Sequence, residues 1–319
     1  MKFKTILFAF GIPVLFAVVI YRVFETDKWR DIYQVMTVTF VFFLPFTAGA
    51  LTVFLSPKKL AESIPYRIFA PWVPIMFFFM LTIAISWEGW VCWMMMLPFF
   101  LFIATLGGLY SGYLKKRISS MNEKLNISLL ILLPFLLSPV EQMIKTITGT
   151  YEAYTEIEIN SSAEKIWGNV TRVGEIKQEQ DKGKLTEFMG FPRPIKAELN
   201  FEGIGATREA IFSKGLVFHE TVLSYEDKKK MVFTIKANPY DIPSTTMDEH
   251  IVIGGDYFDV LDGTYELEKL DKNKYRLHLY SHFVLSTNFN FYASWWGKWI
   301  MKDIQNNILH VIKERAEHE

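Results

Sequence analysis

The sequence predicts a chain of two parts: a bundle of about five membrane-spanning α-helices over residues 1–148 and an α+β domain over residues 149–319. Two observations predict this division. Apolar runs of about 20 residues recur in the first part, whereas short segments that alternate apolar and polar residues fill the second. The net charge also changes sign, because the first part carries 13 Lys and Arg against 7 Asp and Glu, and the second carries 21 against 27. The overall neutrality is therefore a cancellation between two regions.

The composition excludes several classes of protein. Cys92 is the single cysteine, so the chain has no intramolecular disulfide and no zinc module built on cysteines. An aromatic content of 16% with only 21% charged residues excludes a disordered chain. Because the chain has no basic block and its second part is acidic, we expect no nucleic-acid partner. We also expect no cofactor and no bound metal.

Five apolar segments predict the membrane helices, because about 20 residues at 1.5 Å each cross roughly 30 Å of hydrocarbon. The first segment follows a basic start and lacks a signal-peptide cleavage site, so we interpret it as a retained anchor. For the fifth, which contains Pro134 and has Glu141 near its end, a re-entrant or interfacial helix is the alternative. The predicted spans are residues 5–24, 35–55, 68–87, 90–114 and 125–144.

Loop charges predict the orientation of the bundle. With a cytoplasmic amino terminus, the inside segments hold nine Lys and Arg and the outside segments hold four, as the positive-inside rule requires. Five spans then place the second part outside the cytoplasm, whereas four would place it inside. We expect an integral protein of a bacterial plasma membrane with an extracytoplasmic domain. The spans contain essentially no ionisable residues, which favours an anchoring bundle over a transport pathway.

Short alternating segments predict an antiparallel sheet in the second part. The first strand is expected at residues 151–159, and Ser161 with Glu164 has the spacing of a capping box that begins a helix with Trp167 on its inner face. Turn residues such as those of Ser213–Gly215 separate the later segments and predict hairpins. These later strands are expected at residues 196–201, 206–212, 216–225, 231–237, 263–270 and 275–285.

A long amphipathic helix is expected at residues 288–317. Apolar residues from Tyr292 to Ile312 recur at three- and four-residue spacing, and polar residues such as Lys298 and Asp303 occupy the other face. Such a stripe is typical of a helix that lies along the apolar face of a sheet.

The order of these elements resembles the helix-grip fold of the SRPBCC or START/Bet v 1-like superfamily, which includes polyketide cyclases, dehydrases and lipid-transport proteins. The resemblance covers residues 151–317 and is carried by residues 157–167 (IEINSSAEKIW), 203–208 (GIGATR) and 263–267 (GTYEL), together with the amphipathic end helix. The membrane bundle has no counterpart in the soluble members. The resemblance implies a curved sheet that grips the terminal helix, with an apolar cavity for a lipid, sterol, polyketide or other hydrophobic ligand between them.

Large aromatic residues are candidates for the lining of such a cavity, and filling a solid core is the alternative use of the same side chains. Arg208 and Glu209 adjoin on one strand, so their side chains point to opposite faces. An inward Arg208 would pair with a ligand carboxylate or phosphate, whereas an outward one would join a surface ion pair. The predicted ligand-binding residues are Arg208, His250, Tyr257, Tyr265, Phe283, Tyr292, Trp295, Trp296 and Trp299.

A 24-residue segment, residues 239–262, is longer than a hairpin needs and holds the densest acidic cluster of the chain. By its position it would cover the mouth of the cavity. A metal site, a general acid–base pair and a hydrogen-bonded structural lid all stay open, although the spacing matches no established metal-ligand signature. The cluster consists of Asp248, Glu249, His250, Asp256, Asp259 and Asp262, and the candidate catalytic residues are His250, Asp248, Glu249 and Asp259.

Three functions are compatible with these features. The first is a membrane-anchored module that binds or transports a hydrophobic, lipid-like ligand. The second is a membrane-tethered enzyme of the cyclase, dehydrase or hydrolase type that acts on an apolar substrate, and the third is a structural or interaction protein with a solid core. The sequence favours binding over catalysis. The expected partners are the lipid bilayer and a hydrophobic small molecule, and the oligomeric state stays open.

Overall fold

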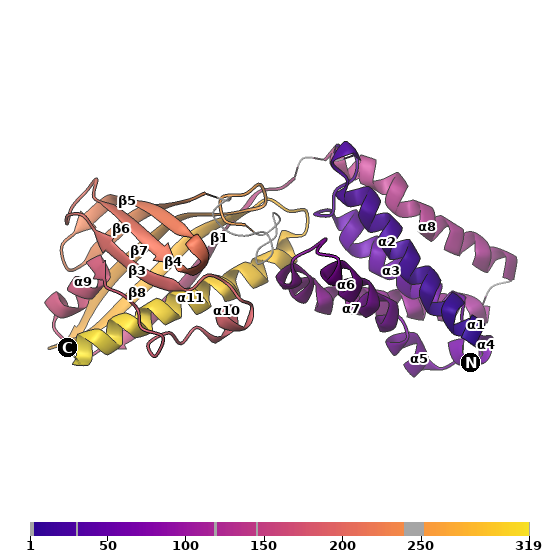
Figure 1. Cartoon of the computed structure of the whole chain (residues 1–319), viewed down its shortest axis with the longest axis horizontal. Helices are drawn as coiled ribbons and strands as arrows, with labels where there is room; N and C mark the ends of the chain where they lie inside the picture. Colours follow the sequence, from indigo (N-terminus) through magenta and orange to yellow (C-terminus); the bar gives the residue numbers. More distant parts are fainter. Residues whose placement is uncertain (1–2, 30, 118–119, 145, 239–251, 319) are drawn as a thin grey trace. The chain divides into compact units, whose positions relative to one another are not determined.

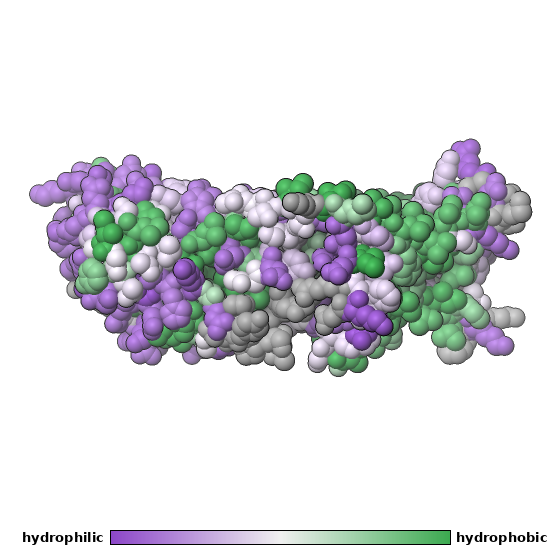
Figure 2. All heavy atoms as spheres, turned by 90° about the horizontal axis from the view of Figure 1, so that it is seen from above, coloured by the Kyte–Doolittle hydropathy of each residue, from purple (hydrophilic) through white to green (hydrophobic). Residues whose placement is uncertain are grey.

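The computed structural model describes residues 3–29, 31–117, 120–144, 146–238 and 252–318 (Figure 1). The chain divides into two compact units, Met1–Ile147 with Thr287–Phe289 and Thr148–Ser286 with Asn290–Glu319. Hydrophobic residues gather over the helices of the first unit and hydrophilic residues over the second (Figure 2). The two units therefore present different surfaces to their surroundings.

The first unit consists of apolar helices. Those long and apolar enough to cross a membrane, by length and composition, are Lys4–Glu25, Ile64–Ala84, Trp90–Arg117 and Asn122–Gln142. The predicted second span is a shorter helix of 17 residues, about 25 Å long. The elements are α1 (Phe3–Ile6), η1 (Leu7–Gly11), α2 (Ile12–Glu25), η2 (Asp27–Trp29), α3 (Val38–Phe54), α4 (Lys58–Ala61), α5 (Ile64–Phe69), α6 (Trp72–Ala84), α7 (Trp90–Arg117) and α8 (Ser120–Gln142).

Local capping explains why α3 is shorter than the apolar run predicts. The Thr37 hydroxyl oxygen accepts a hydrogen bond from the Phe40 backbone N–H at 3.1 Å, so Thr37 is the N-cap. The helix therefore begins at Val38, three residues after the expected start at residue 35.

Helices α3 and α7 approach each other closely at glycines. A Cβ on Gly107 would lie 1.9 Å from the Phe46 carbonyl oxygen, and one on Gly49 would lie 2.1 Å from the Ala104 carbonyl oxygen. Each glycine thus faces the backbone of the other helix. Small residues at a helix interface are a common means of packing in a membrane bundle.

The second unit is built on an eight-stranded sheet. Its strand order is β1-β8-β7-β6-β5-β4-β3-β2, and every neighbouring pair is antiparallel. The sheet curls around the terminal helix (Figure 1), so the predicted α+β helix-grip architecture is confirmed. The strands are β1 (Gly149–Ile159), β2 (Arg172–Val173), β3 (Pro194–Leu199), β4 (Thr207–Phe212), β5 (Val217–Glu226), β6 (Lys230–Ala237), β7 (Phe258–Asp271) and β8 (Lys274–Leu285), and the helices are α9 (Ala163–Thr171), α10 (Lys184–Phe188), η3 (Ser213–Gly215) and α11 (Asn290–His318).

Strand β7 begins earlier than predicted, because residues 258–262 of the expected loop pair with β8. The register of this pairing shifts between Val260 and Asp262, which marks a β-bulge. A bulge interrupts the two-residue alternation by which a strand is detected in sequence, so the first part of β7 resembled a loop.

The start of α9 lies one residue later than predicted. Ser162 is its N-cap, since the hydroxyl oxygen accepts from the Lys165 backbone N–H at 3.4 Å. The expected cap, Ser161, instead donates its hydroxyl to the Ala316 carbonyl at 2.6 Å and ties the end of β1 to α11. Trp167 is buried on the inner face, as predicted, and Ile166 is buried beside it.

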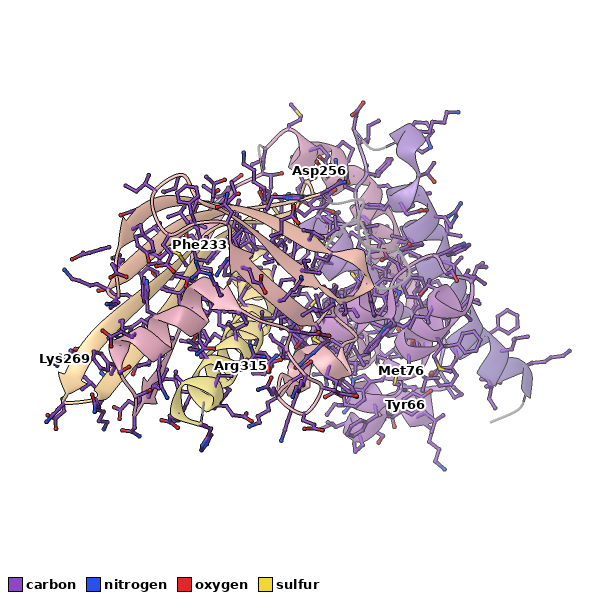
Figure 3. All side chains as sticks on the ribbon, turned by 60° about the vertical axis from the view of Figure 1, so that its left-hand side comes forward. Tyr66, Met76, Phe233, Asp256, Lys269 and Arg315 are labelled. Atoms are coloured by element: carbon purple, nitrogen blue, oxygen red, sulfur yellow. The ribbon has the colours of Figure 1, made fainter. Side chains whose placement is uncertain are left out.

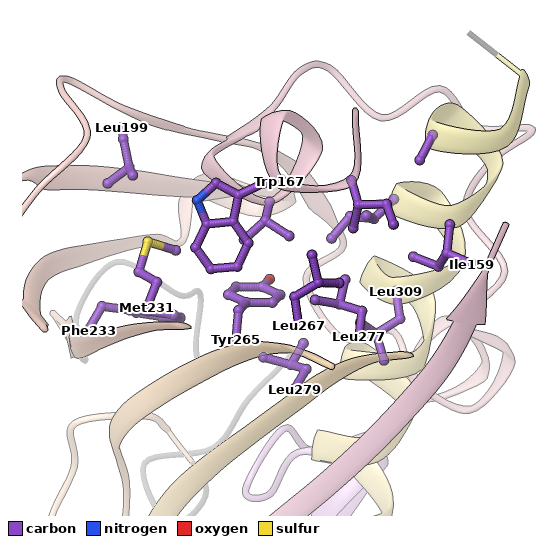
Figure 4. Packing of buried hydrophobic residues seen from close by; sticks show 14 of the residues in the cluster. Ile159, Trp167, Leu199, Met231, Phe233, Tyr265, Leu267, Leu277, Leu279 and Leu309 are labelled. Atoms are coloured by element: carbon purple, nitrogen blue, oxygen red, sulfur yellow. The ribbon is translucent and has the colours of Figure 1, made fainter. Parts of the chain in front are cut away.

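The core of the second unit lies between the sheet and helices α9 and α11. Trp167 points toward Tyr265 and Met231 of the sheet (Figure 4), and its indole N–H donates to the Tyr225 hydroxyl at 2.9 Å. Arg315, on the last turns of α11 (Figure 3), donates to the Glu175 carbonyl at 2.7 Å. These contacts hold α9, the segment after β2 and the carboxyl-terminal helix on one face of the sheet.

Candidate functional site

A cavity lies between the inner face of the sheet and α11. The cavity has a volume of about 100 Å³ and lies within a hollow of about 800 Å³ that is partly open to solvent. Most of the lining side chains are apolar. The lining consists of Val173, Ile176, Pro194, Lys196, Ala197, Arg208, Ala210, Ile211, Phe212, Phe218, Glu220, Phe233, Ile235, Ile253, Val260, Tyr265, Leu279, Ser281, Met301, Ile304, Gln305 and Ile308.

One buried ion pair interrupts this apolar lining. The Arg208 Nε donates to the Glu220 carboxylate at 2.5 Å, and the two side chains are only 4% and 5% exposed. The pair forms because β4 and β5 are a hairpin in which Arg208 is directly opposite Glu220. Arg208 Nη1 also donates to the Val170 carbonyl at 3.1 Å, so the guanidinium is held from two sides.

Two stacked rings lie beside this guanidinium. Its carbon is 4.7 Å from the centre of the Phe233 ring and 5.8 Å from that of Tyr265, and the two rings are 5.9 Å apart with 24° between their planes. The stack depends on a glycine, because a Cβ on Gly263 would lie 2.4 Å from the Phe233 ring. A cation beside aromatic faces is stabilised by their quadrupoles.

Burial sets the electrostatics of this group of side chains. Burial raises the pKa of the Glu220 carboxyl, and the Arg208 charge opposes that shift. Burial also raises the pKa of the Tyr265 phenol, again against the influence of Arg208. For Arg208, burial lowers the pKa, but Glu220 and Tyr265 raise it and leave it above its ordinary value. Arg208 therefore stays charged, and Glu220 is its counter-ion.

A second polar group lies where α11 crosses the sheet. Gln305 donates through Nε2 to the Ala153 carbonyl and to the Ser281 hydroxyl oxygen, both at 3.1 Å, and its Oε1 accepts from the Thr155 hydroxyl at 3.3 Å. These bonds use both amide protons of Gln305. Ser281 accepts from Gln305, so its own proton remains available to a further acceptor.

The predicted ligand-binding residues fall into different environments. Arg208 and Tyr265 line the cavity. Phe283 is fully buried in a neighbouring packed cluster with Val260 and Met301. Tyr292 is half-buried on α11, and Tyr257 is half-buried in the bend before β7. His250 lies outside the described residues.

The tryptophans of α11 lie away from the cavity. Trp295 is 74% exposed and Trp299 is 63% exposed, while the half-buried Trp296 packs its ring 5.6 Å from that of Trp299. The close approach of α11 to the sheet explains this, because a Cβ on Gly297 would lie 2.8 Å from the Phe283 ring. Small residues must face the sheet there, and the large rings turn outward.

Little of the predicted acidic cluster can be placed at a common site. Asp248, Glu249 and His250 lie outside the described residues. Asp259 accepts from the Val260 backbone N–H at 2.8 Å, and burial raises the pKa of its carboxyl. The Asp262 carboxylate lies 2.8 Å from Nδ1 of the His282 ring. Asp262 and His282 are paired across β7 and β8, and the next pair, Gly263 and Ser281, faces inward. Among the described residues, no group of His, Cys, Asp and Glu is arranged to hold a metal ion.

Sequence reasoning missed Glu220, Ser281 and Gln305. A signal existed for Glu220, because a hairpin turn centred on Lys214 places residue 220 opposite Arg208. Gln305 is a polar residue within the apolar stripe of the last helix, between Met301 and Leu309. Ser281 alternates inward with Leu279 and Phe283. Each of these signals depends on knowing which face of the element is inside.

Taken together, these side chains make an apolar cavity with two fixed polar points. The buried Arg208 charge is already balanced by Glu220, and the other cation of the lining, Lys196, is exposed. The cavity offers the Ser281 hydroxyl within mainly apolar walls. Sites of this kind orient an apolar molecule through a small number of polar contacts.

The sequence matches no family model and no curated protein. Among solved structures, norcoclaurine synthase from Thalictrum flavum is similar at 14% identity over 54% of this chain and 89% of that chain, with a TM-score of 0.34. The Aha1 dimer from Colwellia psychrerythraea matches at 17% identity over 53% and 97%, with a TM-score of 0.27. Ara h 8.0201 matches at 11% identity over 53% and 98%, with a TM-score of 0.31. At these values the matches carry no argument about function, and the helix-grip class of the second unit rests on its own strand order and terminal helix.

Proposed function

We propose that the protein is a membrane-anchored module that binds or transports a hydrophobic, lipid-like molecule in the cavity between the sheet and α11. The observation that carries this proposal is the cavity itself, which keeps unfilled space among mainly apolar side chains. Protein interiors normally pack to crystal-like density, so a core that only stabilises the fold would fill such space. A solid docking domain is the function that this observation disfavours.

The balance of charge narrows the ligand class. An anionic headgroup deep in the cavity would meet Glu220 as well as Arg208, and it would lose its hydration beside a cation that is already paired, because the other cation of the lining, Lys196, is exposed. A neutral ligand with one hydroxyl or carbonyl oxygen has a donor in Ser281. We therefore propose a neutral alkyl or isoprenoid-like ligand with a single polar group.

The volume limits the part of the ligand that enters. Engineered cavities of about 150 Å³ bind benzene, and the corresponding space here is about 100 Å³. A slender alkyl chain fits that space more readily than a fused ring system. The rest of a longer molecule would occupy the open part of the cavity.

Hydrogen exchange of the full chain in nanodiscs, with and without 1-decanol, tests this proposal. We expect decanol to slow exchange in β4, β5 and α11, because a ligand that binds only the folded state stabilises it. Ala210→Phe places a ring into the cavity and should abolish the protection. Glu209→Phe adds the same ring to the outer face of the same strand and should leave it intact.

The outcomes of that experiment separate binding from a bilayer effect. Equal protection in Ala210→Phe and Glu209→Phe, or protection confined to the helices of the first unit, would contradict the proposal. If Ala210→Phe fails to fold, the variant Ile304→Trp takes its place in the experiment, because residue 304 lines the same cavity from α11.

We further propose that the amino terminus is cytoplasmic and that the second unit lies outside the cytoplasm. The excess of basic residues in the alternate loops supports this orientation. Paired carboxyl-terminal fusions to alkaline phosphatase and to green fluorescent protein test it. Phosphatase activity without fluorescence is expected, and fluorescence without phosphatase activity would overturn the orientation.

A further inference from the structure

The exposed stripe of α11 changes its chemistry along the helix. Phe291, Trp295 and Trp299 follow at four-residue spacing and are 68%, 74% and 63% exposed. The same stripe continues with the exposed residues Lys302 and Asn306. Residues at this spacing share one helix face, so a single face is aromatic in its first turns and polar afterwards.

Exposed aromatic rings in a row differ from the scattered apolar residues that any surface shows. Contiguous apolar surface marks a place where a soluble part of a protein meets a partner or a membrane. Two lysines, Lys298 and Lys302, are exposed beside these rings. Tryptophan with flanking lysine is the combination that favours the headgroup region of a bilayer, since the ring is amphipathic and the ammonium attracts anionic lipid.

The covalent structure keeps this stripe within reach of a bilayer. The last candidate span ends at Gln142 and β1 begins at Gly149, so the connecting chain extends at most about 25 Å. Gly149 pairs with Leu285, and the Asn290 side chain donates to the Leu285 carbonyl at 3.2 Å. The first turn of α11 is therefore at the tethered end of the second unit.

The same geometry places the polar part of the stripe farther away. Trp299 is eight residues and about 12 Å beyond Phe291 along the helix, and Asn306 is about 10 Å beyond Trp299. The aromatic part of the face is therefore closer to the chain that connects the two units than the polar part is.

We propose that the face of α11 formed by Phe291, Trp295, Lys298 and Trp299 docks on the surface of an anionic lipid bilayer. The proposal rests on the membrane placement of the first unit and is independent of whether the cavity holds a ligand. Its occupant is the lipid headgroup region. A surface of the first unit and a second copy of the chain are the other occupants that the experiment distinguishes.

Spin labels on the full chain in vesicles of phosphatidylcholine and phosphatidylglycerol test the docking. In a Cys92→Ser background, Lys298→Cys carries a nitroxide within the aromatic part and Asn306→Cys carries one within the polar part of the same stripe. Both substitutions leave the three rings in place. Power saturation measures collisions with oxygen, which concentrates in the bilayer, and with a water-soluble nickel complex.

We expect the ratio of oxygen to nickel collisions to be severalfold higher at residue 298 than at residue 306. In the Lys298→Cys chain, the added substitutions Trp295→Ser and Trp299→Ser should lower the ratio of oxygen to nickel collisions at residue 298 to its value at residue 306. Vesicles without phosphatidylglycerol should lower that ratio in the same way. Equal ratios at the two positions would overturn the proposal. Exclusion of both reagents at residue 298 would also overturn it, because that result indicates cover by protein.

Discussion

The buried pair Arg208–Glu220 gives the sharpest prediction about stability. Glu220→Gln keeps the volume of the side chain and an oxygen that can accept from Arg208, but it removes the negative charge. Arg208 then remains 4% exposed with an uncompensated charge. Removal of one partner from a buried ion pair is strongly destabilising for this reason.

The magnitude follows from the geometry. Two unit charges about 4 Å apart attract by about 4 kcal/mol at an effective dielectric constant near 20. Measured losses for buried pairs that lose one partner are about 3–5 kcal/mol. We therefore expect Glu220→Gln to lower the free energy of unfolding of the second unit by about 3–5 kcal/mol. The double variant Arg208→Met with Glu220→Leu should lose much less, because neither charge remains.

Pulse proteolysis of the full chain in detergent micelles across a urea series measures this free energy. Glu209→Gln is the matched control, because Glu209 follows Arg208 in the sequence and its side chain is 67% exposed. Its carboxylate lies 3.8 Å from Nδ1 of His219. An exposed pair of this kind contributes at most about 1 kcal/mol. A loss in Glu220→Gln no greater than that in Glu209→Gln would refute the reasoning.

Two further predictions concern packing in the bundle and the pH dependence of stability. Gly107→Ala should separate α3 from α7, because the added Cβ would lie 1.9 Å from the Phe46 carbonyl oxygen of α3. Thermal denaturation in micelles should therefore show a lower midpoint temperature of unfolding. An unchanged midpoint temperature would contradict this packing. The hydrogen bond from Lys230, at 2.9 Å, holds the pKa of Glu266 below its usual 4.5, so its contribution is present above pH 4.5 and is lost as pH falls through the folded-state pKa. Urea unfolding between pH 6 and pH 3 should therefore show a smaller loss of stability in Glu266→Gln than in the unsubstituted chain, and parallel profiles would count against this role.

The order of the elements could be predicted from the sequence because its signals are local. Alternation, turn residues and the amphipathic last helix identified six of the later strands and α11 within a few residues, apart from the start of β7. The two-residue strand β2 is too short to show any period. The N-cap of α9 was placed one residue early because two serines adjoin there, and only tertiary contact with Ala316 distinguishes them.

The composition of the cavity depended on facts that the sequence does not carry directly. The sequence leaves Arg208 free to point inward or outward, and its burial opposite Glu220 of β5 shows that it points inward. The large rings of α11 were natural candidates for a lining, yet Gly297 is what allows the helix to approach Phe283. Hydrophobicity indicates which residues avoid water, whereas close approach decides which face of a helix meets a sheet.

Photochemical crosslinking tests most directly whether the cavity holds an apolar ligand. The probe is a dodecanol with a diazirine on its chain, added to the full chain in lipid vesicles and mapped by mass spectrometry of the crosslinked peptides. We predict crosslinks in the peptides that contain Phe212, Ile235 and Met301, which line the cavity, and their loss in Ala210→Phe but not in Glu209→Phe. Crosslinks confined to the helices of the first unit, or cavity crosslinks that persist in Ala210→Phe, would contradict the account.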